Sequence, residues 1–158
     1  MAVNDAVKLK LYNKAIELES DNASAYIYRG DAYFAQSNFE AALADYDTLI
    51  QLEPDTAFNY FRRGSTYVRL EQYELGVADF DKVIELLPNY AQAYRSRGTA
   101  NMQQGRYEEA INYINQAIEL QPDYIDAFYA RALVYRHLRQ YEQAVTDLDQ
   151  VLDLLPNA

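Results

Sequence analysis

Apolar and aromatic residues recur along this chain at spacings of three and four, as at Tyr60, Gly64 and Tyr67. Such spacing places them on one face of an α-helix and predicts a series of amphipathic helices. Short polar breaks such as Ser37-Asn38 separate the helical segments. The expected helices span residues 3–19, 23–37, 39–53, 57–71, 73–87, 91–104, 107–121, 125–139 and 141–155.

The same pattern returns every 34 residues, and the prolines mark its register most clearly. The chain has four of them, Pro54, Pro88, Pro122 and Pro156, each 34 residues after the last. Other positions then align in columns of one residue type. The columns are Tyr26, Tyr60, Tyr94 and Phe128; Arg29, Arg63, Arg97 and Arg131; Gly30, Gly64, Gly98 and Ala132; Phe39, Tyr73, Tyr107 and Tyr141; and the small residues Ala42, Gly76, Ala110 and Ala144. A fixed period of this length predicts an array of stacked helix pairs.

The order of these columns resembles the tetratricopeptide repeat (TPR). The resemblance covers four units, residues 23–56, 57–90, 91–124 and 125–158, after a half repeat or cap at 1–22. The chain departs from the family pattern where Tyr or Phe replaces the usual Trp, Arg replaces the Leu before Gly, and Ala132 replaces the last Gly. The resemblance implies an all-α, right-handed superhelix of about nine helices. It also implies a non-catalytic scaffold, without cofactor, that binds a peptide or protein on the concave face formed by the first helix of each pair.

Charge divides unevenly between the two sets of helices. The predicted first helices carry nine of the ten arginines against three acids, while the rest of the chain holds five bases and 21 acids. If the first helices line the concave face, a positive trough lies inside an acidic shell. Arginine binds carboxylates through paired hydrogen bonds, and exposed aromatic residues give apolar anchor points. We therefore expect an extended or helical ligand that is acidic with apolar anchors.

The residues expected to line this trough lie on the first-helix face opposite the small column. They are Ile27, Tyr28, Asp31 and Phe34; Phe58, Phe61, Arg62, Ser65 and Arg69; Gln92, Arg95, Ser96, Thr99 and Met102; and Tyr129, Leu133, Arg136 and His137. The alternative interpretation is a solvated face whose arginines pair locally. The carboxylate clamp by which some TPR domains hold chaperone tails does not fit, because its positions hold Ile27, Asp31, Arg62, Gln92 and Ser96, or one unit later Phe61, Ser65, Ser96, Asp126 and Ala130.

The arginine column Arg29, Arg63, Arg97 and Arg131 is expected to be structural instead. It lies one turn from the small column and runs beside Asp45, Asp79 and Asp147, with Tyr113 as the exception. We expect these arginines to form ion pairs within or between units.

Other candidate chemistry is weak. The Asp-x-Asp pairs, such as Asp45 and Asp47, diverge on a helix and cannot share a metal ion. His137 is the only histidine, and the chain has no cysteine. No phosphate loop or nucleophile motif is present, so we predict no enzyme and no metal site. The formal charge of -10 argues against nucleic acid as a partner.

The last predicted helix has a wide apolar stripe without a polar outer face. The stripe includes Val145, Leu148, Leu152 and Leu155. The alternative function is therefore a structural assembly module that self-associates through this helix. No signal-peptide or membrane-spanning pattern occurs, so membrane is not an expected partner and a cytoplasmic location is expected.

Overall fold

A computed structural model describes residues 5–155, and these residues form nine α-helices and no strand. The helices are α1 (Asp5–Leu18), α2 (Ala23–Ala35), α3 (Phe39–Leu52), α4 (Ala57–Arg69), α5 (Tyr73–Leu86), α6 (Ala91–Gln103), α7 (Tyr107–Leu120), α8 (Ile125–His137) and α9 (Tyr141–Leu154). The predicted all-α architecture is confirmed, and each described helix lies within two residues of its expected bounds. The first two residues of the helix expected at 3–19 lie outside the described range.

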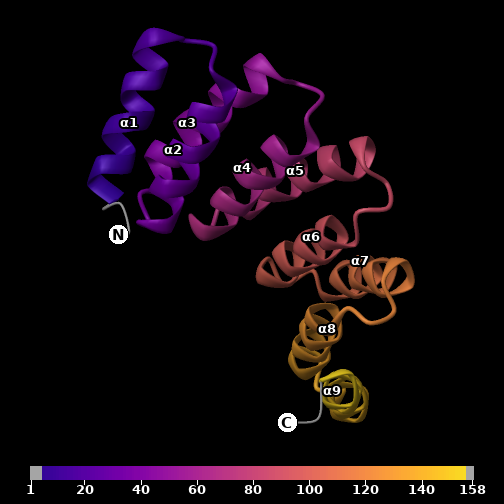
Figure 1. The fold of residues 1–158 in the computed structure, drawn as a ribbon. Coiled ribbons are helices and arrows are strands. Elements are labelled where there is room, and N and C mark those ends of the chain that lie inside the picture. The colour runs from indigo at the N-terminus through magenta and orange to yellow at the C-terminus, as the bar shows by residue number, and fades with distance from the viewer. Residues whose placement is uncertain (1–4, 156–158) are drawn as a thin grey trace.

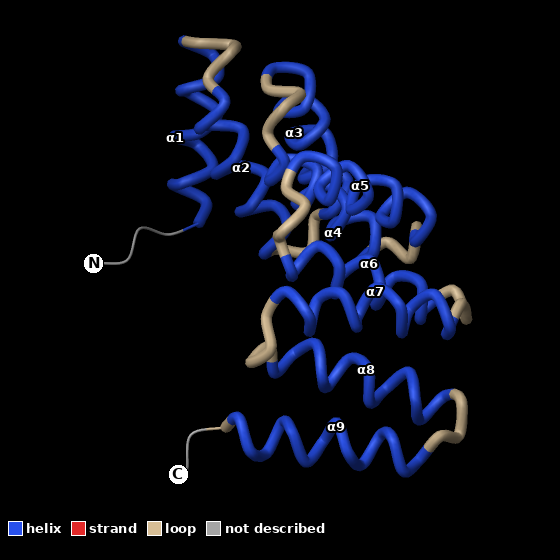
Figure 2. The backbone as a smooth tube through the Cα atoms, turned by 90° about the vertical axis from the view of Figure 1, so that its right-hand side faces the viewer, coloured by secondary structure: helices blue, strands red, loops and turns tan. Residues whose placement is uncertain are grey.

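The helices form a solenoid in which each helix packs on the next one along the chain (Figures 1 and 2). The first helices of the units are α2, α4, α6 and α8. Contacts between units also join α4 to α6 and α6 to α8, and in the described range no two second helices lie as close. The first helices therefore line the inner side of the curve, and the second helices lie outside.

The small column lets the two helices of a unit approach closely. A Cβ atom on Gly64 would lie 3.2 Å from the carbonyl oxygen of Gly76 on the paired helix. A Cβ atom on Gly98 would lie 2.6 Å from Cγ1 of Ile114. The interior is packed at this crossing, so any added volume forces a side chain or the backbone to move.

Each first helix is followed, two residues beyond its end, by a residue with positive φ. Gly105 has φ 74°, and Ser37, Glu71 and Arg139 each have φ 59° at the equivalent place. The next amide bonds back into the helix, as Gln72 N–H does to the Tyr67 carbonyl at 2.9 Å, which closes a Schellman motif. Only the third of these turns contains glycine, so the other three adopt the left-handed conformation with an ordinary side chain, because the motif imposes it.

The polar residue after each proline could cap the first helix that follows it. Asp55 does not do so. The N-caps of α4, α6 and α8 are instead Thr56, Tyr90 and Tyr124, one residue later. None of these three side chains makes a capping hydrogen bond, so the two tyrosines remain available for other contacts.

Candidate functional site

Two adjoining hollows lie on the inner side of α2, α4 and α6. The first has a volume of about 150 Å³ and is lined by Asp31, Phe34, Tyr46, Phe61, Arg62 and Ser65. The second has a volume of about 190 Å³ and is lined by Phe34, Ser65, Val68, Arg69, Phe80, Arg95, Ser96 and Thr99. Because Phe34 and Ser65 line both, the two hollows form one surface, which we call the central trough.

Aromatic rings form the floor of the central trough. The Phe61 ring centroid lies 5.6 Å from that of Phe80 and 5.7 Å from that of Tyr90. Phe58 meets Tyr90 edge to face at 5.5 Å, and Phe58 itself is exposed. Rings held by one another lose little rotational freedom on binding, so they suit a role as apolar anchor points.

The three arginines of the central trough differ in their partners. Nε of Arg62 lies 3.1 Å from a carboxylate oxygen of Asp31, so its charge is already paired. The Arg95 Nε donates to the Tyr124 hydroxyl at 2.8 Å. The Arg69 guanidinium lies over an aromatic ring, with its carbon 5.7 Å from the Phe34 centroid. In the described part of the chain, Arg69 and Arg95 have no carboxylate partner.

Asp31 also anchors a buried hydroxyl. Tyr46 donates to Asp31 at 2.8 Å from the core of the first unit. Burial, followed by this hydrogen bond to a carboxylate, raises the pKa of Tyr46 well above its usual range. Asp31 therefore accepts hydrogen bonds from both Tyr46 and Arg62.

Several residues expected in the trough lie elsewhere or have local partners. Ile27 packs against the core of the first unit and Met102 against that of the third and fourth. Tyr28 stacks on Tyr12 of α1 at 5.8 Å. Gln92 accepts a hydrogen bond from the Tyr90 hydroxyl at 2.7 Å, and His137 stacks on Tyr107.

The fourth unit has a hollow of its own, about 350 Å³ in volume. Its lining comprises Tyr129, Ala132, Leu133, Arg136, Tyr141, Ala144, Val145 and Leu148. It shares no lining residue with the central trough. The structure thus divides the predicted site into two parts, and Arg136 belongs to the terminal one.

Three residues that line the central trough were not predicted from the sequence: Tyr46 in the first hollow, and Val68 and Phe80 in the second. Nor were Tyr90, which contacts Phe61, and Tyr124, which accepts a hydrogen bond from Arg95. Tyr90 and Tyr124 share a column just before their first helices, and this shared aromatic character was the available signal.

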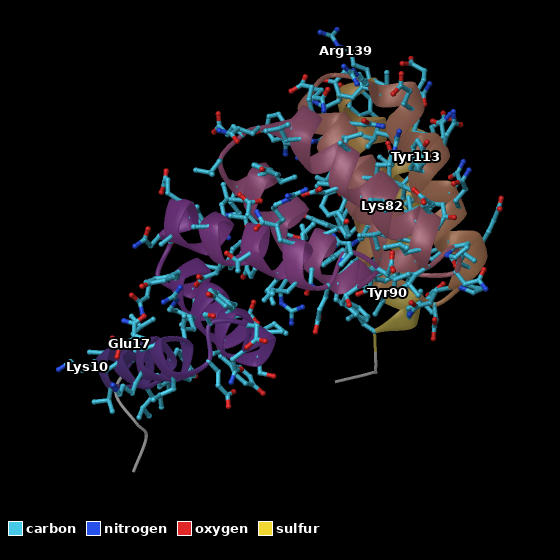
Figure 3. The ribbon with its side chains drawn as sticks, turned by 90° about the horizontal axis from the view of Figure 1, so that it is seen from above. Lys10, Glu17, Lys82, Tyr90, Tyr113 and Arg139 are labelled. Carbon is cyan, nitrogen blue, oxygen red and sulfur yellow. The ribbon has the colours of Figure 1, made fainter. Side chains whose placement is uncertain are left out.

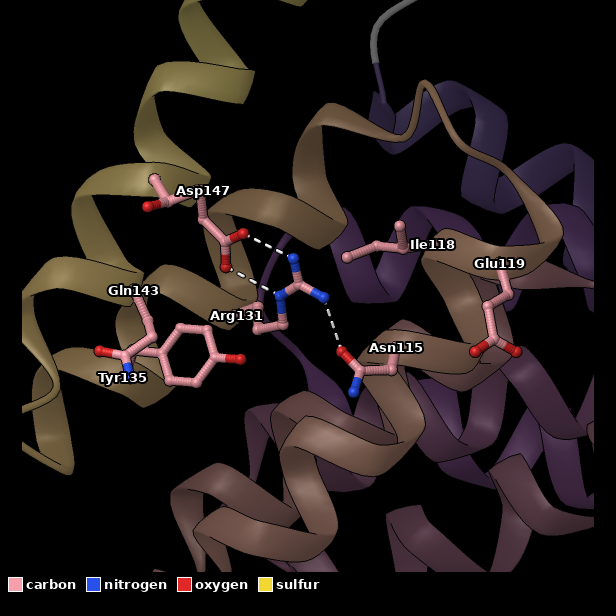
Figure 4. A pocket seen from close by; sticks show the side chains of 8 residues that line it. Asn115, Ile118, Glu119, Arg131, Tyr135, Gln143 and Asp147 are labelled. Atoms are coloured by element: carbon pink, nitrogen blue, oxygen red, sulfur yellow. Dashed lines mark hydrogen bonds and ion pairs between the residues drawn. The ribbon is translucent and has the colours of Figure 1, made fainter.

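The arginine column is structural, as predicted. Asp147 accepts two hydrogen bonds from Arg131, at 2.6 and 2.8 Å, and a third goes to Asn115 at 2.6 Å (Figure 4). Arg29 and Arg63 bind Asp45 and Asp79 in the same way. Each of these arginines therefore joins its own second helix to the second helix of the preceding unit.

The third unit is the exception that the sequence indicated. Tyr113 replaces the aspartate, and the Arg97 guanidinium lies 3.5 Å over its ring while pairing with Asp81 of the preceding unit. Tyr113 lies on α7, the second helix of this unit. The Asp-x-Asp pairs contribute to these contacts between units. Asp45 binds Arg29 of its own unit, and Asp47 binds Arg63 of the next unit. Among residues 5–155, no three metal-ligating side chains gather at one place.

Three family models match the chain, all of them tetratricopeptide repeats. They cover residues 30–101, 98–138 and 125–158, and so together extend from residue 30 to residue 158. The chain belongs to the tetratricopeptide repeat family. No curated protein matches it. None of the described helices is long and apolar enough to span a membrane.

Solved structures with the same fold include MamA from Desulfovibrio magneticus RS-1. It has a TM-score of 0.85 at 20% identity, with 92% of this chain and 82% of that one covered. YrrB, described as a TPR protein with an unusual peptide-binding site, has a TM-score of 0.78 at 27% identity, covering 94% and 77%. The first TPR of Spaghetti (RPAP3), bound to the HSP90 peptide SRMEEVD, has a TM-score of 0.71 at 25% identity, covering 77% and 96%.

Proposed function

We propose that this chain is a protein-interaction scaffold that binds an acidic peptide segment with an apolar anchor in the central trough. The observation that carries the proposal is the pair Arg69 and Arg95. Both line the same hollow as Phe34 and Phe80, and neither has a carboxylate partner among the described residues. A ligand carboxylate beside an apolar side chain would satisfy both kinds of surface.

The trough favours one particular arrangement of the ligand. An apolar side chain enters between Phe34 and Phe80, and a carboxylate lies near Arg69 and Arg95. Ser65, Ser96 and Thr99 line the same hollow, although the Thr99 hydroxyl already donates to the Arg95 carbonyl at 2.9 Å. The two serines are therefore the hydroxyls that remain to bind the ligand backbone.

Two similar structures support a peptide as the ligand. The YrrB structure is described as having a peptide-binding site, and the RPAP3 peptide SRMEEVD is acidic with apolar residues. This chain lacks the clamp residues expected for chaperone tails. Recognition of an acidic segment would therefore rest on Arg69 and Arg95 instead.

A peptide array tests the proposal. Twelve-residue peptides varying in charge and apolar content, with SRMEEVD included, are probed with the labelled chain, and the best binder is measured by calorimetry. We expect the chain to retain peptides that combine acidic residues with Leu, Met or Phe. Their Kd should be ~1 μM, which corresponds to a binding free energy of about -8 kcal/mol. Arg69→Gln combined with Arg95→Gln should weaken binding by about a hundredfold, roughly tenfold for each lost charge-assisted bond.

Arg106→Gln is the matched control, because Arg106 is an exposed arginine at the start of α7, away from the trough. It removes the same charge and should leave Kd unchanged. An equal loss in the control would mean that net charge alone drives binding. Full affinity in the Arg69→Gln, Arg95→Gln variant would refute the assignment of the trough.

A further inference from the structure

The last helix exposes a side chain whose equivalents on the other second helices are buried. Leu148 of α9 is 40% exposed, whereas its equivalents Phe80 and Ile114 are 1% and 0% exposed. Leu152, one turn later, is 67% exposed. With Tyr141 and Val145 these side chains form one exposed apolar stripe, at helical spacings of three and four.

Acidic groups border this stripe. Asp149 occupies the place at which Asp47 and Asp81 each accept the arginine of the following unit. It has no ion-pair partner in the described part of the chain. Glu142 lies one turn from Val145 on the same side. α9 contains four acids and no base, so its outer face attracts a basic apolar surface.

The first helix offers such a surface at the opposite end of the molecule (Figure 1). Val7, Leu11 and Leu18 are exposed and share one side of α1, and no residue of α1 is buried. Lys10 and Lys14 lie on that same side, where Lys14 is paired with Glu17 in an exposed contact. Figure 3 shows Lys10 projecting outward from this end, and it has no acidic partner among residues 5–155.

We propose that α9 of one copy docks on α1 of a second copy, with Leu148 and Leu152 against Leu11 and Asp149 near Lys10. The two surfaces match in apolar character and are opposite in charge. They lie at different ends of one chain, so the contact is heterologous and leaves a free α1 and a free α9 after each addition. The result is head-to-tail growth of chains, which is independent of ligand binding in the central trough.

Sedimentation velocity of the 158-residue chain over a range of concentrations tests this contact. The mean mass should rise with concentration beyond that of a dimer and fall as salt is added. Leu152→Glu should weaken association by about tenfold or more, because it removes a leucine that the contact would bury and places a charge against Leu11 of the other copy. Leu75→Glu, at an exposed leucine on interior helix α5, makes the same change away from both ends and should have no effect.

A charge exchange identifies the partner surface. Lys10→Glu with Lys14→Glu should abolish growth, and adding Glu142→Lys with Asp149→Lys to the same chain should restore it. Circular dichroism of each variant should show an unchanged helix content, because the substituted side chains are exposed. A wild-type chain that stays monomeric would overturn the proposal. So would growth that stops at a dimer and strengthens with salt, because that result indicates a symmetric contact between two copies of α9.

Discussion

Replacing Arg63 by methionine removes one member of the arginine column while keeping an apolar stem of similar length. Arg63 binds both oxygens of Asp79, at 2.7 and 2.9 Å, and one oxygen of Asp47 at 2.8 Å. The Asp79 side chain is 7% exposed and that of Asp47 is 48% exposed. Water can therefore solvate Asp47 in the variant, but Asp79 is left as a buried charge without a partner.

The size of the loss follows from that burial. Breaking a buried ion pair from one side costs about 3–5 kcal/mol, whereas an exposed pair contributes about 1 kcal/mol or less. Burial already raises the pKa of Asp79, even beside Arg63, so the carboxylate depends on its cation. We expect Arg63→Met to lower the free energy of unfolding by about 3 kcal/mol or more at neutral pH.

Two further variants isolate the cause. Arg63→Met with Asp79→Leu removes both charges and should recover most of the loss, since Tyr113 shows that an uncharged residue fits this column. Arg97→Met is the matched control. Its partner Asp81 is 50% exposed, so a loss of only about 1 kcal/mol is expected.

Urea unfolding followed by circular dichroism measures all three variants. The pH dependence provides a second test. Without Arg63, the folded-state pKa of Asp79 rises further above its unfolded value. The penalty is then fully present at neutral pH, decreases as pH falls through the raised pKa and is absent below ~4. A loss for Arg63→Met no larger than for Arg97→Met, or no recovery in the double variant, would refute the reasoning.

Three other predictions concern single positions. Asn101 is fully buried, and neither polar atom of its side chain has a hydrogen-bond partner. Asn101→Leu should therefore raise the free energy of unfolding, measured in urea, by about 1–3 kcal/mol. A lower free energy of unfolding would show that the site needs a polar group. Glu71→Gly should relieve the positive φ and stabilise by up to about 1 kcal/mol in the same assay, whereas Gln72→Gly, at a neighbour with negative φ, should destabilise. Tyr46 in the folded chain should stay protonated above pH ~10, where an unfolded tyrosine ionises. The contribution of its raised pKa to the free energy of unfolding is therefore present below that pH and is lost as pH rises. Tyr46→Phe should then leave the tyrosinate absorbance curve unchanged until the chain unfolds, and an earlier loss of signal would contradict this.

The repeat and the arginine column could be read from the residues because both depend on short, regular spacings. A helix pair is local, and an arginine with an aspartate 16 positions later recurs in three of the four units. Packing of one helix on the next then follows from the small column. The residues in the left-handed turns carried no such signal, because Ser37, Glu71 and Arg139 adopt a conformation that a motif imposes on them.

The sequence by itself determined that the chain is an array of helix pairs, which residues pack between them and where positive charge gathers. Only the tertiary structure decided which partner each of those arginines meets. Arg62 meets Asp31 across 31 positions, and Arg95 meets Tyr124 across 29, because successive units bring their first helices together at a particular angle. No periodicity along the chain encodes such a meeting. The lack of a carboxylate partner at Arg69 and Arg95 among the described residues, and the separation of Arg136 from them, are therefore properties of the superhelix.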